Sequence, residues 1–145
     1  MYTNILIATD GSSLASHAVD QGLKLAKALG AKVCFLTVSE RFHVFSLDAD
    51  QLEETSATFS HHMKEQALRT LSEAGAMAEA IGVDAAKVHS EDDEPYQAII
   101  RTAEVRRCDL IVMASHGRRG VSALLLGSET MKVLTHSKIP VLVVR

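Results

Sequence analysis

The sequence predicts an α/β protein, a doubly wound parallel sheet with helices on both faces. Short apolar runs alternate with stretches of helical spacing along all 145 residues, the runs are nearly continuous, and glycines end the first two helical stretches. Continuous apolar runs are typical of parallel strands that are buried on both faces, and strand–helix alternation gives right-handed crossovers. This length suits one core, so we expect a single domain over residues 1–145.

In the first half of the chain, each expected element is marked by its apolar spacing and by the residue that ends it. The polar cluster Asp10-Gly11-Ser12 separates the first strand from the first helix, which Gly30 stops. A longer helix carries apolar residues on one face from Leu52 to Ile81, and Gly82 ends it. These signals predict strands at residues 5–8, 32–38 and 83–89, helices at residues 14–29 and 52–81, and a loop at residues 39–51.

The second half continues the alternation. An acidic turn at residues 91–95 opens a helix, with Pro95 in its first turn and carboxylates near its positive end. Its buried stripe is expected to consist of Tyr96, Ile99, Ile100 and Ala103. The remaining expected elements are a strand at residues 110–113, a helix at residues 128–135 and a strand at residues 139–144.

Composition and charge exclude several classes of protein. A formal net charge of −3 disfavours general nucleic-acid binding, which usually needs a basic face. The apolar runs are too short to span a membrane, and the N-terminus has no basic segment of a signal peptide, so we expect a cytoplasmic protein. The two cysteines, Cys34 and Cys108, lie in or beside apolar runs and are expected to be buried, reduced thiols.

A glycine-rich loop follows the fourth expected strand. It runs from Ala114 through Gly117 to Gly127-Ser128, where the fourth helix begins. Glycines let backbone N–H groups approach a phosphate, and a helix N-terminus adds partial positive charge. Ligands of such sheets bind at the carboxyl ends of the strands, where the loop at Asp10 also lies, so a nucleotide is the first ligand to consider.

These residues resemble the universal stress protein family along the whole chain. The resemblance includes the opening residues 5–12, the block 109–113 and the ending 140–144. Its most specific part is the nucleotide motif G-x2-G-x9-G-[ST], which reads Ala114-x2-Gly117-x9-Gly127-Ser128 and departs from the family only at alanine. Near the third helix, Asp93-Glu94-Pro95 replaces the frequent Gly-x-Pro, at a turn that we do not assign to the site.

The resemblance implies a five-stranded sheet of order 3-2-1-4-5, like that of the adenine nucleotide alpha hydrolases, and a bound ATP, ADP or AMP, with Mg²⁺ where a triphosphate is bound. It implies a homodimer through the edge strand at residues 139–145, which is too apolar for a bare edge and has no covering segment after it. It places the base and ribose near Ala8, Asp10 and Val38. The other nucleotide-binding residues expected from it are Met113, Ala114, His116, Gly117, Arg118, Gly127, Ser128, Glu129 and Thr130.

Several of these residues also have structural interpretations. Asp10 suits a ribose hydroxyl or a water-bridged metal, but also a helix cap or Asx turn. Ser128 could be the N-cap of the fourth helix and also share its hydroxyl with a phosphate. His116 could act as an acid or base, or it could only shape the turn. Arg118 or Arg119 could neutralise phosphate or remain a solvated charge.

No catalytic or metal-binding residues are expected. His61 and His62 are adjacent on the long helix and point in different directions, so together with His43 they make a poor metal site. The chain has no G-x4-G-K-[ST], no G-x-G-x-x-G after the first strand and no persuasive nucleophile–base arrangement.

Three functions remain open. The first is a dimeric regulatory module that binds an adenine nucleotide and signals through its dimer or an unidentified protein partner, without catalytic turnover. The second is an interaction protein of the same fold that has lost nucleotide binding. Ala114, which stands where the family motif has glycine, leaves this function possible. The third is a slow ATPase, for which the sequence offers no evident base, arginine finger or carboxylate pair.

Overall fold

Strands and helices alternate along the chain as the apolar spacing predicted. The computed structural model describes residues 1–43, 49–118 and 125–145, and for residues 49–54 it describes the backbone. Its elements are β1 (Asn4–Ala8), α1 (Ser13–Leu29), β2 (Lys32–Ser39), α2 (Ala49–Ile81), β3 (Ala85–Glu91), α3 (Pro95–Val105), β4 (Leu110–Ala114), α4 (Ser128–His136) and β5 (Val141–Val144).

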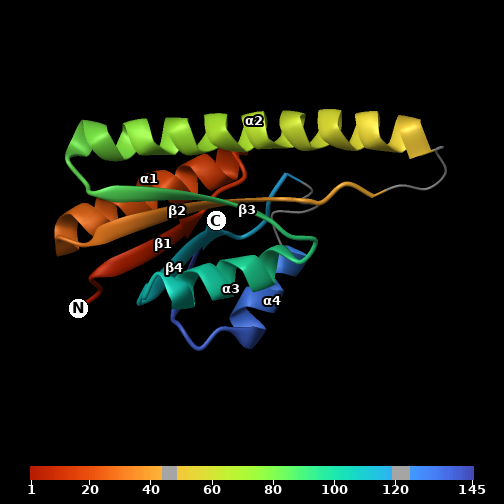
Figure 1. Ribbon diagram of the computed structural model, residues 1–145. Helices are drawn as coiled ribbons and strands as arrows, with labels where there is room; N and C mark the ends of the chain where they lie inside the picture. Colours follow the sequence, from red (N-terminus) through yellow and green to blue (C-terminus); the bar gives the residue numbers. More distant parts are fainter. Residues whose placement is uncertain (44–48, 119–124) are drawn as a thin grey trace.

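The five described strands form one parallel sheet of order β3-β2-β1-β4-β5. Helices α1 and α2 cover one face, and α3 and α4 cover the other (Figure 1). Strand β1 lies at the centre between β2 and β4, with Ile7 in register with both Phe35 and Val112. The expected fold and strand order are therefore confirmed.

Alternate residues of the central strand enter two separate cores. Ile5 and Ile7 are fully buried in the core beneath α1 and α2, whereas Leu6 is buried in the core beneath α3. Gly22 lets α1 approach β1 closely, because a Cβ at this position would lie 2.6 Å from Ile7 Cδ1. This packing fixes the carboxyl end of β1, on which the site depends.

The ends of some elements differ from the expected ones. Helix α2 begins at Ala49, so it includes residues that we expected in the loop before Leu52. Strand β3 begins at Ala85 rather than Val83, because the N–H of Val83 still donates to Ala78 O at the end of α2. Strand β5 begins at Val141, after Pro140.

Cys34 and Cys108 are buried free thiols, as expected. Burial raises the pKa of both, that of Cys108 to about 12, which keeps both thiols protonated near neutral pH and poorly nucleophilic. Within the described ranges, no helix combines the length and apolar character that a membrane span needs.

Candidate functional site

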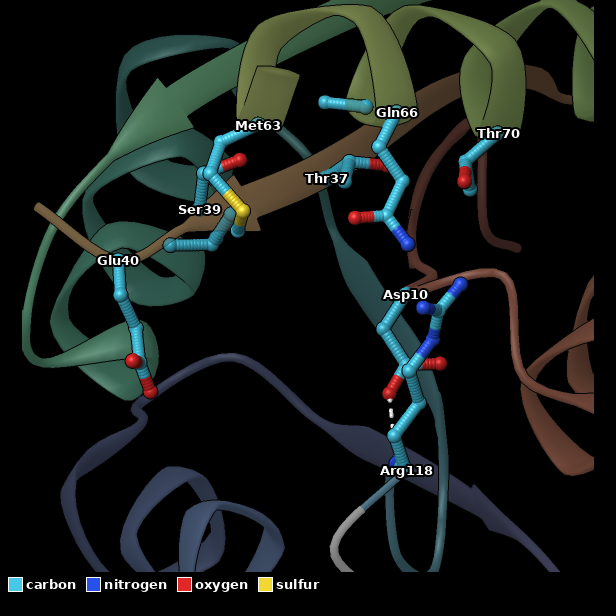
Figure 2. Close-up of a pocket in the computed structure, with 10 residues that line it drawn as sticks. Asp10, Thr37, Ser39, Glu40, Met63, Gln66, Thr70 and Arg118 are labelled. Carbon is cyan, nitrogen blue, oxygen red and sulfur yellow. Dashed lines mark hydrogen bonds between the residues drawn. The ribbon is translucent and has the colours of Figure 1, made fainter. Parts of the chain in front are cut away.

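A cleft of about 180 Å³ lies where β1 and β2 end and where α2 passes over the sheet. Its lining comes from four segments: the β1–α1 turn, the end of β2, the middle of α2 and the loop after β4 (Figure 2). The lining residues are Asp10, Thr37, Val38, Ser39, Glu40, Met63, Gln66, Ala67, Thr70 and Arg118. Three of the expected site residues, Asp10, Val38 and Arg118, are therefore brought together here.

Asp10 joins the first loop to the glycine-rich loop. Its Oδ1 accepts the N–H of Ser12 at 2.9 Å, which is an Asx turn at the start of α1. Its Oδ2 accepts the backbone N–H of Arg118 at 2.9 Å, 108 residues further along the chain. The helix cap itself is Ser12, whose hydroxyl accepts the N–H of Ala15. Asp10 thus sets the distance between the two loops.

Two threonines fix the floor of the cleft. The buried hydroxyl of Thr37 donates to Thr9 O at 2.9 Å, and the N–H of Thr9 donates to Leu36 O at 2.9 Å. These bonds continue the β1–β2 ladder one step beyond the end of β1. As a result, Val38 and Asp10 are held at the same edge of the sheet.

Glycine is required at both motif positions because neighbouring atoms leave no room for a side chain. A Cβ on Gly117 would lie 2.6 Å from Asp10 Oδ2, and a Cβ on Gly127 would lie 3.1 Å from His116 Cα. Neither residue has a positive φ, so a left-handed backbone is not the reason for glycine at either position. The N–H of Gly127 donates to Ser115 O at 2.7 Å, which folds the end of the loop against its beginning.

Helix α4 begins directly beside this loop. Gly127 is its N-cap and Ser128 its first residue, so the expectation that Ser128 would be the N-cap is wrong by one position. The extended backbone of Gly127 lets its carbonyl accept the N–H of Met131, a bond that begins the helix. The buried hydroxyl of Thr130 donates to Ala114 O at 2.9 Å and ties α4 to the end of β4.

Other expected site residues lie in the cores next to the cleft. Ala114 is buried in the core beneath α1 and α2, and Met113 is buried in the core beneath α3. Ala8 is partly buried and packs on that second core. Their side chains support the ends of β1 and β4, and none of the three lines the cleft.

Glu129 is engaged with α3. Its carboxylate accepts the backbone N–H of Tyr96 at 2.8 Å and lies 3.5 Å from Lys132 Nζ. The carboxylates of Glu129 and Glu94 raise the pKa of Lys132, although solvent reaches all three side chains. In this arrangement Glu129 holds α3 and α4 together.

The remaining loop residues differ in position. His116 Nδ1 lies 3.3 Å from the hydroxyl of Ser115, and its backbone packs against Gly127, which fits a residue that shapes the turn. The side chain of Arg118 runs beside Asp10 towards α2 (Figure 2). Arg119 lies outside the described residues.

The α2 wall of the cleft was not expected from the sequence. It consists of Met63, Gln66, Ala67 and Thr70, which lie on the face of α2 that is turned towards the sheet. A signal was present, because Gln66 and Thr70 interrupt an otherwise apolar stripe that includes Ala67 and Leu71. A polar residue within a core-facing stripe can mark a binding site.

The part of the chain that the structure describes holds no cluster of three or more His, Cys, Asp or Glu residues that could bind a metal ion. Both oxygens of Asp10 already accept backbone N–H groups. A Mg²⁺ ion at this site would therefore rely mainly on phosphate oxygens and water, which are ligands that Mg²⁺ commonly keeps.

The fold and the loop define an α/β protein with a cleft at the carboxyl ends of its central strands. The model of the universal stress protein family matches residues 1–145, and the chain belongs to this family. It is 33% identical over 147 residues to a universal stress protein of Methanocaldococcus jannaschii, an alignment that covers 100% of this chain and 83% of the relative.

Solved structures agree with this assignment. The structure of the M. jannaschii protein MJ0577, also a universal stress protein, matches with a TM-score of 0.80 and 30% identity, over 99% of this chain and 96% of the other. A universal stress protein in complex with cAMP matches with a TM-score of 0.73 and 28% identity, over 99% of this chain and 97% of the other.

Proposed function

We propose that this universal stress protein binds an adenine nucleotide, ATP or the related ADP or AMP, and acts as a dimeric regulatory module in the stress response. The observation that carries the proposal is the cleft that joins Asp10, Val38 and Arg118 beside a glycine-rich loop and the start of α4. The relative solved with cAMP supports an adenine nucleotide as the class of ligand.

The residues fit such a ligand in two parts. The cleft of about 180 Å³ is smaller than most small-molecule pockets, which start at roughly 300 Å³, so it suits a base and ribose better than a whole ATP. The phosphates would then extend towards Gly117 and the start of α4 at Ser128, whose first N–H groups have no partner within the helix, whereas the N–H of Gly127 is already bonded to Ser115 O. The N-terminus of α4 adds a favourable potential for anions.

The proposal includes binding without turnover. A phosphoryl-transfer enzyme positions a base or a water molecule and neutralises the developing charge. Near the proposed phosphate position, His116 contacts Ser115 and Asp10 is bonded to two N–H groups, so neither is placed as a free base among the described residues. We expect ATP hydrolysis slower than roughly 1 per second, and a faster rate in a coupled assay would favour the ATPase alternative.

The test begins with the protein as purified. After denaturation, the supernatant is separated by ion-exchange chromatography with detection at 260 nm. A stoichiometric adenine nucleotide is the expected result. An empty supernatant, together with no heat on titration of millimolar ATP and Mg²⁺, would contradict the proposal.

Changing Ala114 to glycine, the residue of the family motif, is expected to leave ATP affinity equal or to tighten it by less than about tenfold. The methyl group of Ala114 lies in the core beneath α1 and α2, and its carbonyl already accepts the hydroxyl of Thr130. The methyl group therefore does not occupy the cleft. Calorimetric titration of both proteins checks this, and a wild type that binds nothing while Ala114→Gly binds well would show that the methyl group closes the site.

The homodimer remains part of the proposal. Strand β5 is an edge of the sheet, and the side chain of its Leu142 is 39% exposed. Two apolar side chains of the neighbouring α4 are also exposed, Leu134 by 43% and Met131 by 55%. An apolar edge is stabilised when a second copy pairs with it across a two-fold axis. Light scattering at micromolar concentration is expected to give the dimer mass, with Leu142→Lys shifted towards monomer. A monomeric wild type would contradict this prediction.

One alternative also has an observation in its favour. Both oxygens of Asp10 are bonded within the protein, and the side chain of Arg118 already lies along the cleft. An interaction protein without nucleotide would use these contacts only to hold its loops together. The chromatographic test separates the two functions, because the interaction protein would give an empty supernatant although it is folded and dimeric.

A further inference from the structure

The side chain of Arg118 occupies part of the cleft. It runs beside Asp10 and points towards Gln66 and Thr70 of α2 (Figure 2). A Cβ placed on Gly11 would lie 3.0 Å from Arg118 Nη2 and 2.8 Å from Thr70 Oγ1, so the guanidinium and this hydroxyl both lie next to Gly11, just before α1. In the proposed function, the cleft belongs to the base and ribose of a nucleotide.

Few interactions hold the guanidinium in this position. Arg118 is exposed, and within the described ranges its side chain makes no hydrogen bond or ion pair. Both oxygens of the nearby Asp10 already accept backbone N–H groups. Gly11 directly precedes Ser12, the N-cap of α1, and the positive end of a helix disfavours a cation. The side chain can therefore leave the cleft at little cost when a stronger partner is present.

A phosphate is such a partner, and the backbone of the loop allows the change. The planar guanidinium of arginine binds phosphate through two parallel hydrogen bonds. Arg118 directly follows Gly117, beside which the phosphates are proposed to lie. The N–H of Arg118 is bonded to Asp10 Oδ2 at 2.9 Å. Rotation about the side-chain bonds therefore moves the guanidinium from the cleft to the phosphates while the main chain stays in place.

We propose that Arg118 makes the site selective for phosphorylated nucleotides over nucleosides. Without a phosphate, the guanidinium occupies the cleft and competes with the base and ribose. With a phosphate, it leaves the cleft and pairs with the ligand. A nucleoside has to displace Arg118 and gains no contact in return. This inference rests on the proposed nucleotide site and gives one side chain two opposite effects on binding.

The test compares ATP with adenosine by calorimetry on the full, nucleotide-free chain. Arg118→Ala is expected to bind ATP about tenfold more weakly than wild type, because charge-assisted hydrogen bonds to phosphate are lost. The same variant is expected to bind adenosine about threefold more tightly or better, because the apparent affinity rises with the fraction of protein whose cleft is open. The two ligands therefore respond in opposite directions to one substitution.

The matched control is Arg69→Ala on α2. Arg69 is exposed and does not line the cleft, so its removal changes the net charge by the same amount as Arg118→Ala. We expect its affinities for ATP and adenosine to equal those of wild type. This control separates the proposed local effect from a general change in the charge of the protein.

A second variant separates the volume of the side chain from its charge, and it serves if circular dichroism shows that Arg118→Ala is unfolded. Arg118→Met keeps a long side chain without the guanidinium, so ATP is expected to bind about tenfold more weakly while adenosine affinity stays near that of wild type.

The outcomes distinguish this inference from the nucleotide site itself. Weaker ATP binding with unchanged adenosine affinity in Arg118→Ala would show that Arg118 contacts phosphate without occupying the cleft. Changes in the same direction for both ligands, or no change in either, would also overturn the inference. In each of these cases the nucleotide site stands. If wild type binds neither ligand at millimolar concentration, both proposals fail.

Discussion

Replacing Gly117 with valine is expected to lower nucleotide affinity by at least about a hundredfold, or nearly 3 kcal/mol, while the fold remains intact. The first added atom, Cβ, would lie 2.6 Å from Asp10 Oδ2, a distance at which one of the two must move. Asp10 has little freedom to move, because both of its oxygens accept backbone N–H groups. The loop would therefore shift away from Asp10, and the branched side chain would occupy space next to the phosphates.

The matched control is Gly75→Ala on α2. The nearest atoms to a Cβ there belong to the flexible side chain of Lys87 on β3, at 3.3 Å, and Gly75 does not line the cleft. Calorimetry and thermal unfolding are measured on both variants. Unchanged ATP affinity in Gly117→Val would remove Gly117 from the site, and an unfolded Gly117→Val would show that its role is structural.

Replacing Asp10 with alanine is expected to weaken ATP binding by about 10- to 100-fold, since hydrogen bonds to a charged group contribute about 1.5–3 kcal/mol each. The substitution removes the acceptors for the N–H groups of Ser12 and Arg118 and the proposed acceptor for the ribose. Helix α1 keeps its cap at Ser12, so the fold is expected to survive.

The control for this variant is Asp20→Ala. Asp20 is an aspartate of α1 whose side chain pairs with Lys24 in solvent, and its removal should leave binding unchanged. ATP titrations of the two variants are compared with wild type. Equal affinity in Asp10→Ala and wild type would mean that Asp10 only holds the two loops together. This is the role that Asp10 has in the interaction protein without nucleotide.

The fold could be predicted from the sequence because its signals are local. Strands β1, β4 and β5 are nearly continuous apolar runs, and Ser12 and Gly30 lie at the two ends of α1 and cap it. Glycine at position 30 has a φ of 65°, which is a conformation that few other residues adopt readily. The strand order came from the family resemblance, since alternation alone leaves the order of the strands open.

The site could be predicted only in part, because its remaining contacts join distant segments. Asp10 was expected because it follows the first strand at the carboxyl edge of the sheet, and Val38 was expected from the family resemblance. The contact between Asp10 and the N–H of Arg118 depends on the path of the loop, and the α2 wall depends on how a long helix crosses the sheet. The path of the loop leaves no pattern at fixed spacing, and the α2 wall leaves only the two polar residues Gln66 and Thr70 within an apolar stripe.

The central claim is that the cleft and the glycine-rich loop together hold one adenine nucleotide per chain. The most direct measurement is calorimetric titration of the purified, nucleotide-free protein with ATP and Mg²⁺, with Gly117→Val measured in parallel. We predict saturable heat with one site per chain and a dissociation constant below about 1 mM, and no such heat for the variant. A folded wild type that gives no heat at millimolar ATP, or a variant that binds as tightly as wild type, would contradict the account.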